Sequence, residues 1–122
     1  MTRGVAAPLV PVIPTYLRLQ GVALDYKARE RIRKKVRTRF AKFAATIERV
    51  SVRVEDVNGP RGGVDQLCRI KVVLSRFPSV VLERRGTTLE EAVDGAIDGA
   101  VRTVRRQLQR RRMRPLKGRK VP

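Results

Sequence analysis

Apolar and polar residues alternate in four stretches of the chain, and each alternation predicts a β-strand. In the first stretch, Leu17 and Leu19 fall on one side, whereas Tyr16, Arg18 and Gln20 fall on the other. Each predicted strand therefore has one apolar face that needs to be covered. The four strands are TYLRLQ at residues 15–20, IERVSVRVEDV at 47–57, QLCRIKVVLS at 66–75 and VVLERR at 80–85.

Apolar residues at spacings of three and four predict a helix between the first two strands. Asp25 stands before this helix, and its carboxylate can accept a hydrogen bond from the first turn. We expect the helix to run to about Ala45, with Phe40 at the margin of its apolar stripe and Arg39 inside it. The stripe consists of Leu24, Ala28, Ile32, Val36 and Phe43.

A second helix is predicted to open on TTLEE, where Thr88 and Glu91 have the spacing of a capping box. Gly95 and Gly99 lie inside this helix, although a glycine there costs about 1 kcal/mol relative to alanine. We interpret them as the place where the two helices approach closely, with the approach of an RNA backbone as the alternative. The apolar stripe consists of Leu89, Val93, Ile97, Ala100, Val104 and Leu108.

The elements follow the order β-α-β-β-β-α, with NGPRGG at residues 58–63 as the tip of a hairpin. Both helices have an apolar stripe, and both need the apolar face of the same sheet. The predicted fold class is therefore α+β, a four-stranded sheet with two helices packed on one face. We expect residues 15–112 to form a single domain between a flexible Pro-rich extension at 1–14 and a basic tail at 113–122.

The charge of the chain is strongly unbalanced, with 29 basic residues against 11 acidic ones and a net charge of +18. Such a chain repels itself when folded and is typical of proteins that bind a polyanion. Most of the excess belongs to the two helices and the tail, whose outer surfaces would merge into one positive ridge. The stretch RERIRKKVRTRF at residues 29–40 places like charges one turn apart, which destabilises a helix. This accumulation favours a surface that matches phosphates over one that is merely solvated.

The rest of the composition argues against other classes of protein. A membrane-surface helix usually presents a broad apolar face. The apolar stripe of the first predicted helix is narrow, and we expect it to pack in the core of the domain. The chain has no histidine and a single cysteine, Cys68, which excludes the common zinc cages and histidine-based catalysis. We expect Cys68 to be a buried thiol in a cytoplasmic protein that has no cofactor, no small-molecule substrate, no membrane partner and no enzymatic activity.

A sheet that binds RNA by stacking needs two or three exposed aromatic rings on its central strands. The second and third predicted strands contain no aromatic residue. RNA recognition is therefore expected to be electrostatic and directed at the backbone of a folded RNA.

Two stretches of the chain, LRLQGVALDYKARERIRKKV and TTLEEAVDGAIDGAVRTVRRQL, resemble the ribosome hibernation-promoting factor family, which includes the ribosome-associated translation inhibitors. The resemblance covers about residues 15–112, and its most specific part is the run Ala92-Val93-Asp94-Gly95-Ala96 that leads into basic residues. It implies a fold akin to a double-stranded-RNA-binding domain. Long members of the family add a carboxy-terminal domain, so this chain resembles the short form.

The resemblance also implies a function. Members of the family bind in the decoding channel of the small ribosomal subunit, where they contact rRNA and occupy the space that messenger and transfer RNAs need. The resemblance implies a translation inhibitor or hibernation factor, monomeric off the ribosome, with small-subunit rRNA as its partner. The alternative is a general binder of structured RNA or a ribosome assembly protein. Carried onto this chain, the rRNA-binding residues would be Arg31, Lys34, Lys35, Arg102, Arg105, Arg106 and Arg110.

Overall fold

The computed structural model describes residues 12–57 and 65–118, with side chains described as far as Arg110. Its helices and strands occur in the predicted order, with one additional 3-10 turn between α1 and β2. The elements are β1 (Thr15–Gln20), α1 (Tyr26–Arg39), η1 (Ala41–Phe43), β2 (Ile47–Asp56), β3 (Gln66–Leu74), β4 (Val80–Gly86) and α2 (Leu89–Gly118).

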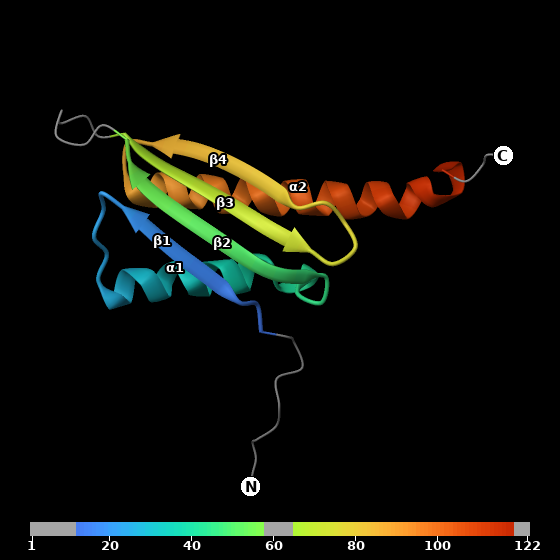
Figure 1. Ribbon diagram of the computed structural model, residues 1–122, viewed down its shortest axis with the longest axis horizontal. Coiled ribbons are helices and arrows are strands. Elements are labelled where there is room, and N and C mark those ends of the chain that lie inside the picture. The colour runs from blue at the N-terminus through green and yellow to red at the C-terminus, as the bar shows by residue number, and fades with distance from the viewer. Residues whose placement is uncertain (1–11, 58–64, 119–122) are drawn as a thin grey trace, which may run out of the picture.

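The four strands form one mixed sheet in the order β1-β2-β3-β4, and both helices cover the same face of it (Figure 1). Strand β1 pairs with β2 in parallel because α1 carries the chain back between them, whereas β2, β3 and β4 pair antiparallel. The predicted α+β fold is therefore confirmed. Since β1 and β4 run in the same direction and each leads into a helix, α1 and α2 are parallel to one another (Figure 1).

The core lies between the sheet and the helices and contains the inward-facing residues of each strand. On β2, Val50, Val52 and Val54 are at most 1% exposed, and on β3 Cys68 and Ile70 are fully buried. Removing such a side chain from water contributes roughly 1.5–3 kcal/mol to folding. The inward faces that the alternating pattern predicts for these two strands are confirmed.

Helix α1 begins where the sequence predicts, because the Asp25 carboxylate accepts a 2.8 Å hydrogen bond from the Ala28 backbone N–H. It ends at Arg39, however, and the prediction that it runs to about Ala45 is wrong. Phe40 leaves the helix at the C-cap and is fully buried in the core rather than at the margin of the stripe. The turn η1 then carries the chain towards β2.

The start of helix α2 is held by Thr87, Thr88 and Glu91. The Thr88 hydroxyl accepts a 3.1 Å hydrogen bond from the Glu91 backbone N–H. In return, the Glu91 carboxylate accepts hydrogen bonds from the backbone N–H of Thr87 at 2.7 Å and from its hydroxyl at 2.9 Å. The predicted capping box is present, with the return bond directed one residue earlier than in the usual pattern.

Gly95 and Gly99 face strand β4, so their interpretation as the contact between the two helices is wrong. A β-carbon at Gly99 would overlap the Leu82 Cδ2 atom and lie 3.1 Å from Arg84 Nη2. One at Gly95 would lie 3.6 Å from Arg84 Cγ. The glycines therefore bring α2 close to the sheet.

The ends of the predicted domain differ in detail from the sequence analysis. Ile13, in the predicted extension, is only 5% exposed, and the Pro14 carbonyl accepts a 2.9 Å hydrogen bond from Val50. Helix α2 continues to Gly118 and so includes part of the predicted tail (Figure 1). The NGPRGG hairpin tip and the first eleven residues lie outside the described residues, and the division into extension, domain and tail stays a prediction.

Candidate nucleic-acid interface

Two ion pairs join the outer surfaces of the parallel helices. The Lys35 ammonium lies 2.6 Å from the Asp94 carboxylate, and one turn further along both helices Arg39 pairs with Asp98. The second pair explains why Arg39 stands within the apolar stripe of α1, since its guanidinium reaches across to α2. Lys35 is only partly exposed, so this predicted rRNA-binding residue is already engaged with a carboxylate.

The other six predicted rRNA-binding residues have a different environment. Each is exposed, and none has a carboxylate within ion-pair distance among the residues that the structure describes. They are Arg31 and Lys34 on α1 and Arg102, Arg105, Arg106 and Arg110 on α2. Because unpaired surface cations keep their full charge for an incoming anion, these six are the stronger candidates for phosphate contacts. Contact with rRNA stays a prediction for all seven residues.

The six cations fall into two groups along the helix pair. Arg31 lines a groove of about 480 Å³ between the amino-terminal halves of the helices, which Glu90 and Asp94 also line. Arg105 lines a cleft of about 370 Å³ together with Lys42 of η1. At a rise of about 1.5 Å per residue, Arg105 lies roughly 16 Å along α2 from Asp94. Arg31 thus has carboxylates beside it in the groove, whereas the described lining of the cleft contains cations and no carboxylate.

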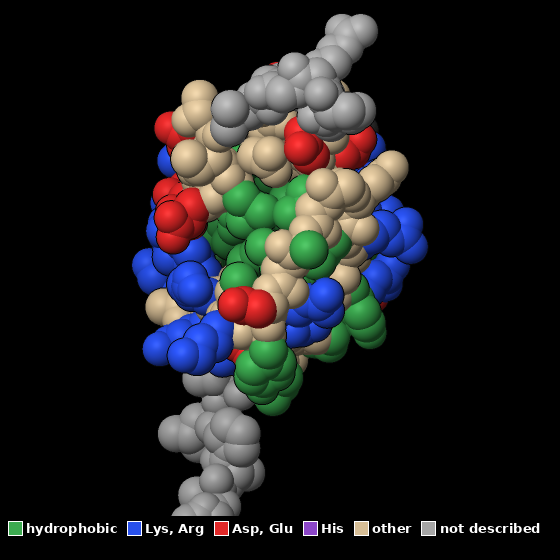
Figure 2. Space-filling model, turned by 90° about the vertical axis from the view of Figure 1, so that its left-hand side faces the viewer, with side chains coloured by type: hydrophobic (Ala, Val, Ile, Leu, Met, Phe, Trp, Pro, Cys, Tyr) green, Lys and Arg blue, Asp and Glu red, His purple; other side chains and the backbone are tan. Residues whose placement is uncertain are grey.

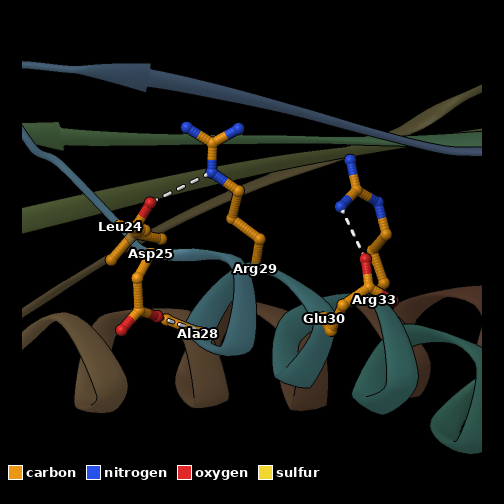
Figure 3. A network of polar contacts seen from close by, with 6 residues as sticks. All are labelled: Leu24, Asp25, Ala28, Arg29, Glu30 and Arg33. Carbon is orange, nitrogen blue, oxygen red and sulfur yellow. Dashed lines mark hydrogen bonds and ion pairs between the residues drawn. The ribbon is translucent and has the colours of Figure 1, made fainter.

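Basic residues near the start of α1 are tied to their own segment (Figure 3). Arg29 donates a 3.2 Å hydrogen bond from Nε to the Leu24 carbonyl, and Arg33 pairs with Glu30 at 3.1 Å. These local bonds offset part of the repulsion expected between like charges one turn apart. Because Arg29 and Arg33 have these partners, they differ from the six unpaired cations.

A further group of cations, which the sequence did not reveal, lies on the face of the sheet that the helices leave open. Arg18, Arg53, Arg69 and Lys71 line a hollow on that face. The alternation of each strand indicates that these side chains point away from the core. Only the pairing of the strands, which the sequence does not give, shows that they lie together.

Cys68 has the inert environment that the sequence predicts for it. The residue is fully buried, and desolvation raises the pKa of its thiol to about 12. Since the thiolate is the reactive form of cysteine, the side chain acts as a small apolar group.

Within the described residues, Cys, Asp and Glu side chains form no group of three or more that could hold a metal ion. No described helix combines the length and the apolar character needed to cross a membrane.

Comparison with known proteins identifies the family. The comparison with curated protein sequences gave no match. Among solved structures, the chain is similar to the N-terminal domain of Thermus thermophilus Protein Y, with 19% identity, a TM-score of 0.64, and coverage of 77% of this chain and 98% of that one. It is also similar to a ribosomal subunit interface protein from Coxiella burnetii, with 14% identity, a TM-score of 0.65, and coverage of 77% and 96%. These likenesses show a shared fold.

A family model described as Sigma 54 modulation protein / S30EA ribosomal protein matches residues 17–112. The match extends from β1 to the exposed arginines of α2 and so includes every described element that carries the candidate interface. The chain therefore belongs to the Sigma 54 modulation protein / S30EA ribosomal protein family, which confirms the family resemblance found in its sequence.

Proposed function

We propose that this protein is a cytoplasmic translation inhibitor that binds small-subunit rRNA through the outer surface of its helix pair. The observation that carries the proposal is the set of six exposed cations on α1 and α2 without a carboxylate partner in the described structure. The family is described as an S30EA ribosomal protein family, and one protein of similar fold is a ribosomal subunit interface protein, which supports the ribosome as the partner.

The helix pair suits this role because its cations are positioned before any RNA arrives. The Lys35–Asp94 and Arg39–Asp98 ion pairs hold α1 against α2, and the buried stripes of both helices fix them on the sheet. A rigid surface loses little conformational freedom when it binds, so more of the phosphate attraction appears as affinity.

Inhibition by this protein needs no chemical step. Once the cations hold rRNA in the decoding channel between the head and the body of the subunit, the bulk of the domain occupies the space that messenger and transfer RNAs need. The protein acts stoichiometrically, one domain for each subunit, and the ribosome is held inactive until the domain dissociates.

The salt dependence of binding to isolated small subunits tests the role of the helix surface. Six phosphate contacts on the helices contribute about −5.4 to the slope of log affinity against log salt, which corresponds to a fall in affinity of about 10³-fold between 50 and 200 mM salt. Replacing Arg102, Arg105 and Arg106 by Glu should reduce the magnitude of the slope by about 2.7, whereas replacing the same residues by Lys should leave the slope nearly unchanged. A slope near zero for the wild-type protein would refute the proposed mode of binding.

Competition separates this function from that of a general binder of structured RNA or an assembly protein. Excess duplex RNA should displace the protein poorly from intact small subunits, and excess protein should block assembly of an initiation complex. Equal affinity for duplex RNA and subunits, or normal initiation in the presence of excess protein, would favour the general RNA binder.

A further inference from the structure

The face of the sheet opposite the helices carries a second concentration of positive charge. A hollow of about 430 Å³, which we call the sheet-face hollow, lies over β1, β2 and β3 on this face. Four cations and no carboxylate are among the described residues that line it. Figure 2 views one end of the molecule and shows Lys and Arg side chains on both of its flanks, so positive charge is not confined to one side. The described lining residues are Tyr16, Leu17, Arg18, Ser51, Val52, Arg53, Arg69 and Lys71.

The register of the sheet places three of these cations in one row. Arg18 on β1 pairs with Arg53 on β2, and Arg53 pairs with Arg69 on β3. Like charges directly opposite one another destabilise a sheet. A face that served only solubility would avoid this arrangement, because alternating carboxylates and guanidinium groups keep a surface hydrated without the repulsion.

The protein itself neutralises these cations only in part. Arg69 lies 3.6 Å from the Glu83 carboxylate, and the Arg53 Nε atom lies 3.9 Å from that of Glu55. Both distances exceed the roughly 2.7–2.9 Å of a charge-assisted hydrogen bond. Arg18 and Lys71 have no carboxylate within ion-pair distance among residues 12–57 and 65–110. The hollow therefore keeps positive charge that its described neighbours do not fully neutralise, and such charge favours an external anion.

We propose that the sheet-face hollow binds the phosphate backbone of a second RNA segment, on the opposite side of the domain from the helix surface. Charge complementarity favours a polyanion, and Tyr16, which is 59% exposed at the rim of the hollow, offers a ring on which a base can stack. This aromatic contact favours RNA over an acidic protein segment. The inference rests on the proposed function in taking RNA as the partner, but it concerns a different surface.

The dimensions of the row set how much RNA the hollow holds. Neighbouring strands lie about 4.8 Å apart, so the three arginines span roughly 10 Å across the sheet. That length accommodates about two phosphates, each of which contributes about 0.7 to 0.9 to the salt slope. A domain with RNA on both faces would hold two RNA segments together and resist their separation.

The test uses the full chain and the variant Arg18→Glu/Lys71→Glu, which reverses the two cations without a carboxylate partner. The matched control, Arg29→Glu/Arg76→Glu, makes the same change in net charge at exposed positions that belong neither to the six unpaired helix cations nor to the sheet-face hollow. Binding to isolated small subunits is measured over a salt series. The sheet variant should lower the slope by about 1.4 to 1.8, whereas the control should lower it by less than about 0.5.

Direct contact is measured separately by following backbone amide signals while a short single-stranded RNA oligonucleotide is added. The amides of β1, β2 and β3 around the hollow should shift, and polyglutamate of equal charge should shift them far less. Equal shifts with polyglutamate would overturn the choice of RNA, and shifts confined to α1 and α2 would overturn the hollow as a site.

The outcomes keep this inference distinct from the proposed function. If the wild-type protein binds subunits and the sheet variant keeps the wild-type slope, the hollow fails and the helix surface stands. If the wild-type protein does not bind subunits, the proposed function fails. The oligonucleotide titration then still shows whether the sheet-face hollow binds RNA. Thermal unfolding verifies that the sheet variant is folded, and Arg18→Gln/Lys71→Gln, with an expected slope decrease in the same direction, replaces it if it is not.

Discussion

Alanine substitutions at Gly95 and Gly99 measure how closely helix α2 packs on strand β4. Both glycines lie inside the helix, where alanine is favoured by about 1 kcal/mol if its methyl group meets no obstacle. At Gly95 the new methyl group would lie 3.6 Å from Arg84 Cγ, which is an ordinary contact. Gly95→Ala should therefore raise the free energy of unfolding by up to about 1 kcal/mol.

The same substitution at Gly99 should have a different result. Its methyl group would overlap Leu82 Cδ2, so the half-buried Leu82 side chain has to move. Inserting a methyl group into packed space costs about 1–3 kcal/mol. After the gain in helix propensity, Gly99→Ala should range from neutral to about 2 kcal/mol destabilising, so the two variants should differ by about 1–3 kcal/mol.

Urea unfolding followed by far-ultraviolet circular dichroism measures this difference. Because truncating Leu82 removes the obstacle, the double variant Leu82→Ala/Gly99→Ala should be more stable than the sum of its single substitutions predicts. If Gly99→Ala stabilises the protein as much as Gly95→Ala does, then α2 does not pack on β4 as described.

Four further predictions concern single contacts. Thr88→Ala removes the cap of α2 and should lower the free energy of unfolding by about 1 kcal/mol, with a matching fall in melting temperature. Hydrogen bonds from the Thr87 backbone N–H and hydroxyl lower the pKa of the Glu91 carboxyl. The stabilisation by Glu91 should therefore be full above the ordinary pKa of 4.5 and be lost as the pH falls through the lowered value. Stability against pH for wild type and Glu91→Gln should therefore converge in acid, and parallel curves would contradict this. Cys68 should react with a thiol reagent only at the rate of unfolding, since it is buried with a pKa of about 12, and fast labelling of the folded protein would be inconsistent with its burial. A double-mutant cycle on Lys35 and Asp94, both partly exposed, should give a coupling energy of about 0.2–1 kcal/mol. A coupling energy of zero would show that this ion pair does not stabilise the contact between the helices.

The strands of this protein could be predicted from sequence because their alternation is regular. Inward residues such as Val52 and Ile70 are where the pattern places them, and the order of the elements follows directly. The end of α1 could not be found in the same way. The apolar spacing continues through Phe40 and Phe43 although the helix has ended, and no glycine or proline stands at Arg39 to mark the change.

Contacts between distant segments account for what the sequence did not reveal. Lys35 looks like any other exposed cation of α1 until the fold brings Asp94 beside it. Gly99 looked like a contact between helices, but Leu82 lies against it instead. The sheet-face hollow depends on the pairing of strands, and a shift of one residue in register would turn these cations to the other face.

The most direct test of the proposed function is a density map of the protein bound to the small ribosomal subunit. We expect the domain to occupy the decoding channel, with the exposed cations of α1 and α2 within hydrogen-bond distance of rRNA phosphates. A domain bound elsewhere on the subunit, or one in the channel with both helices facing solvent, would contradict it.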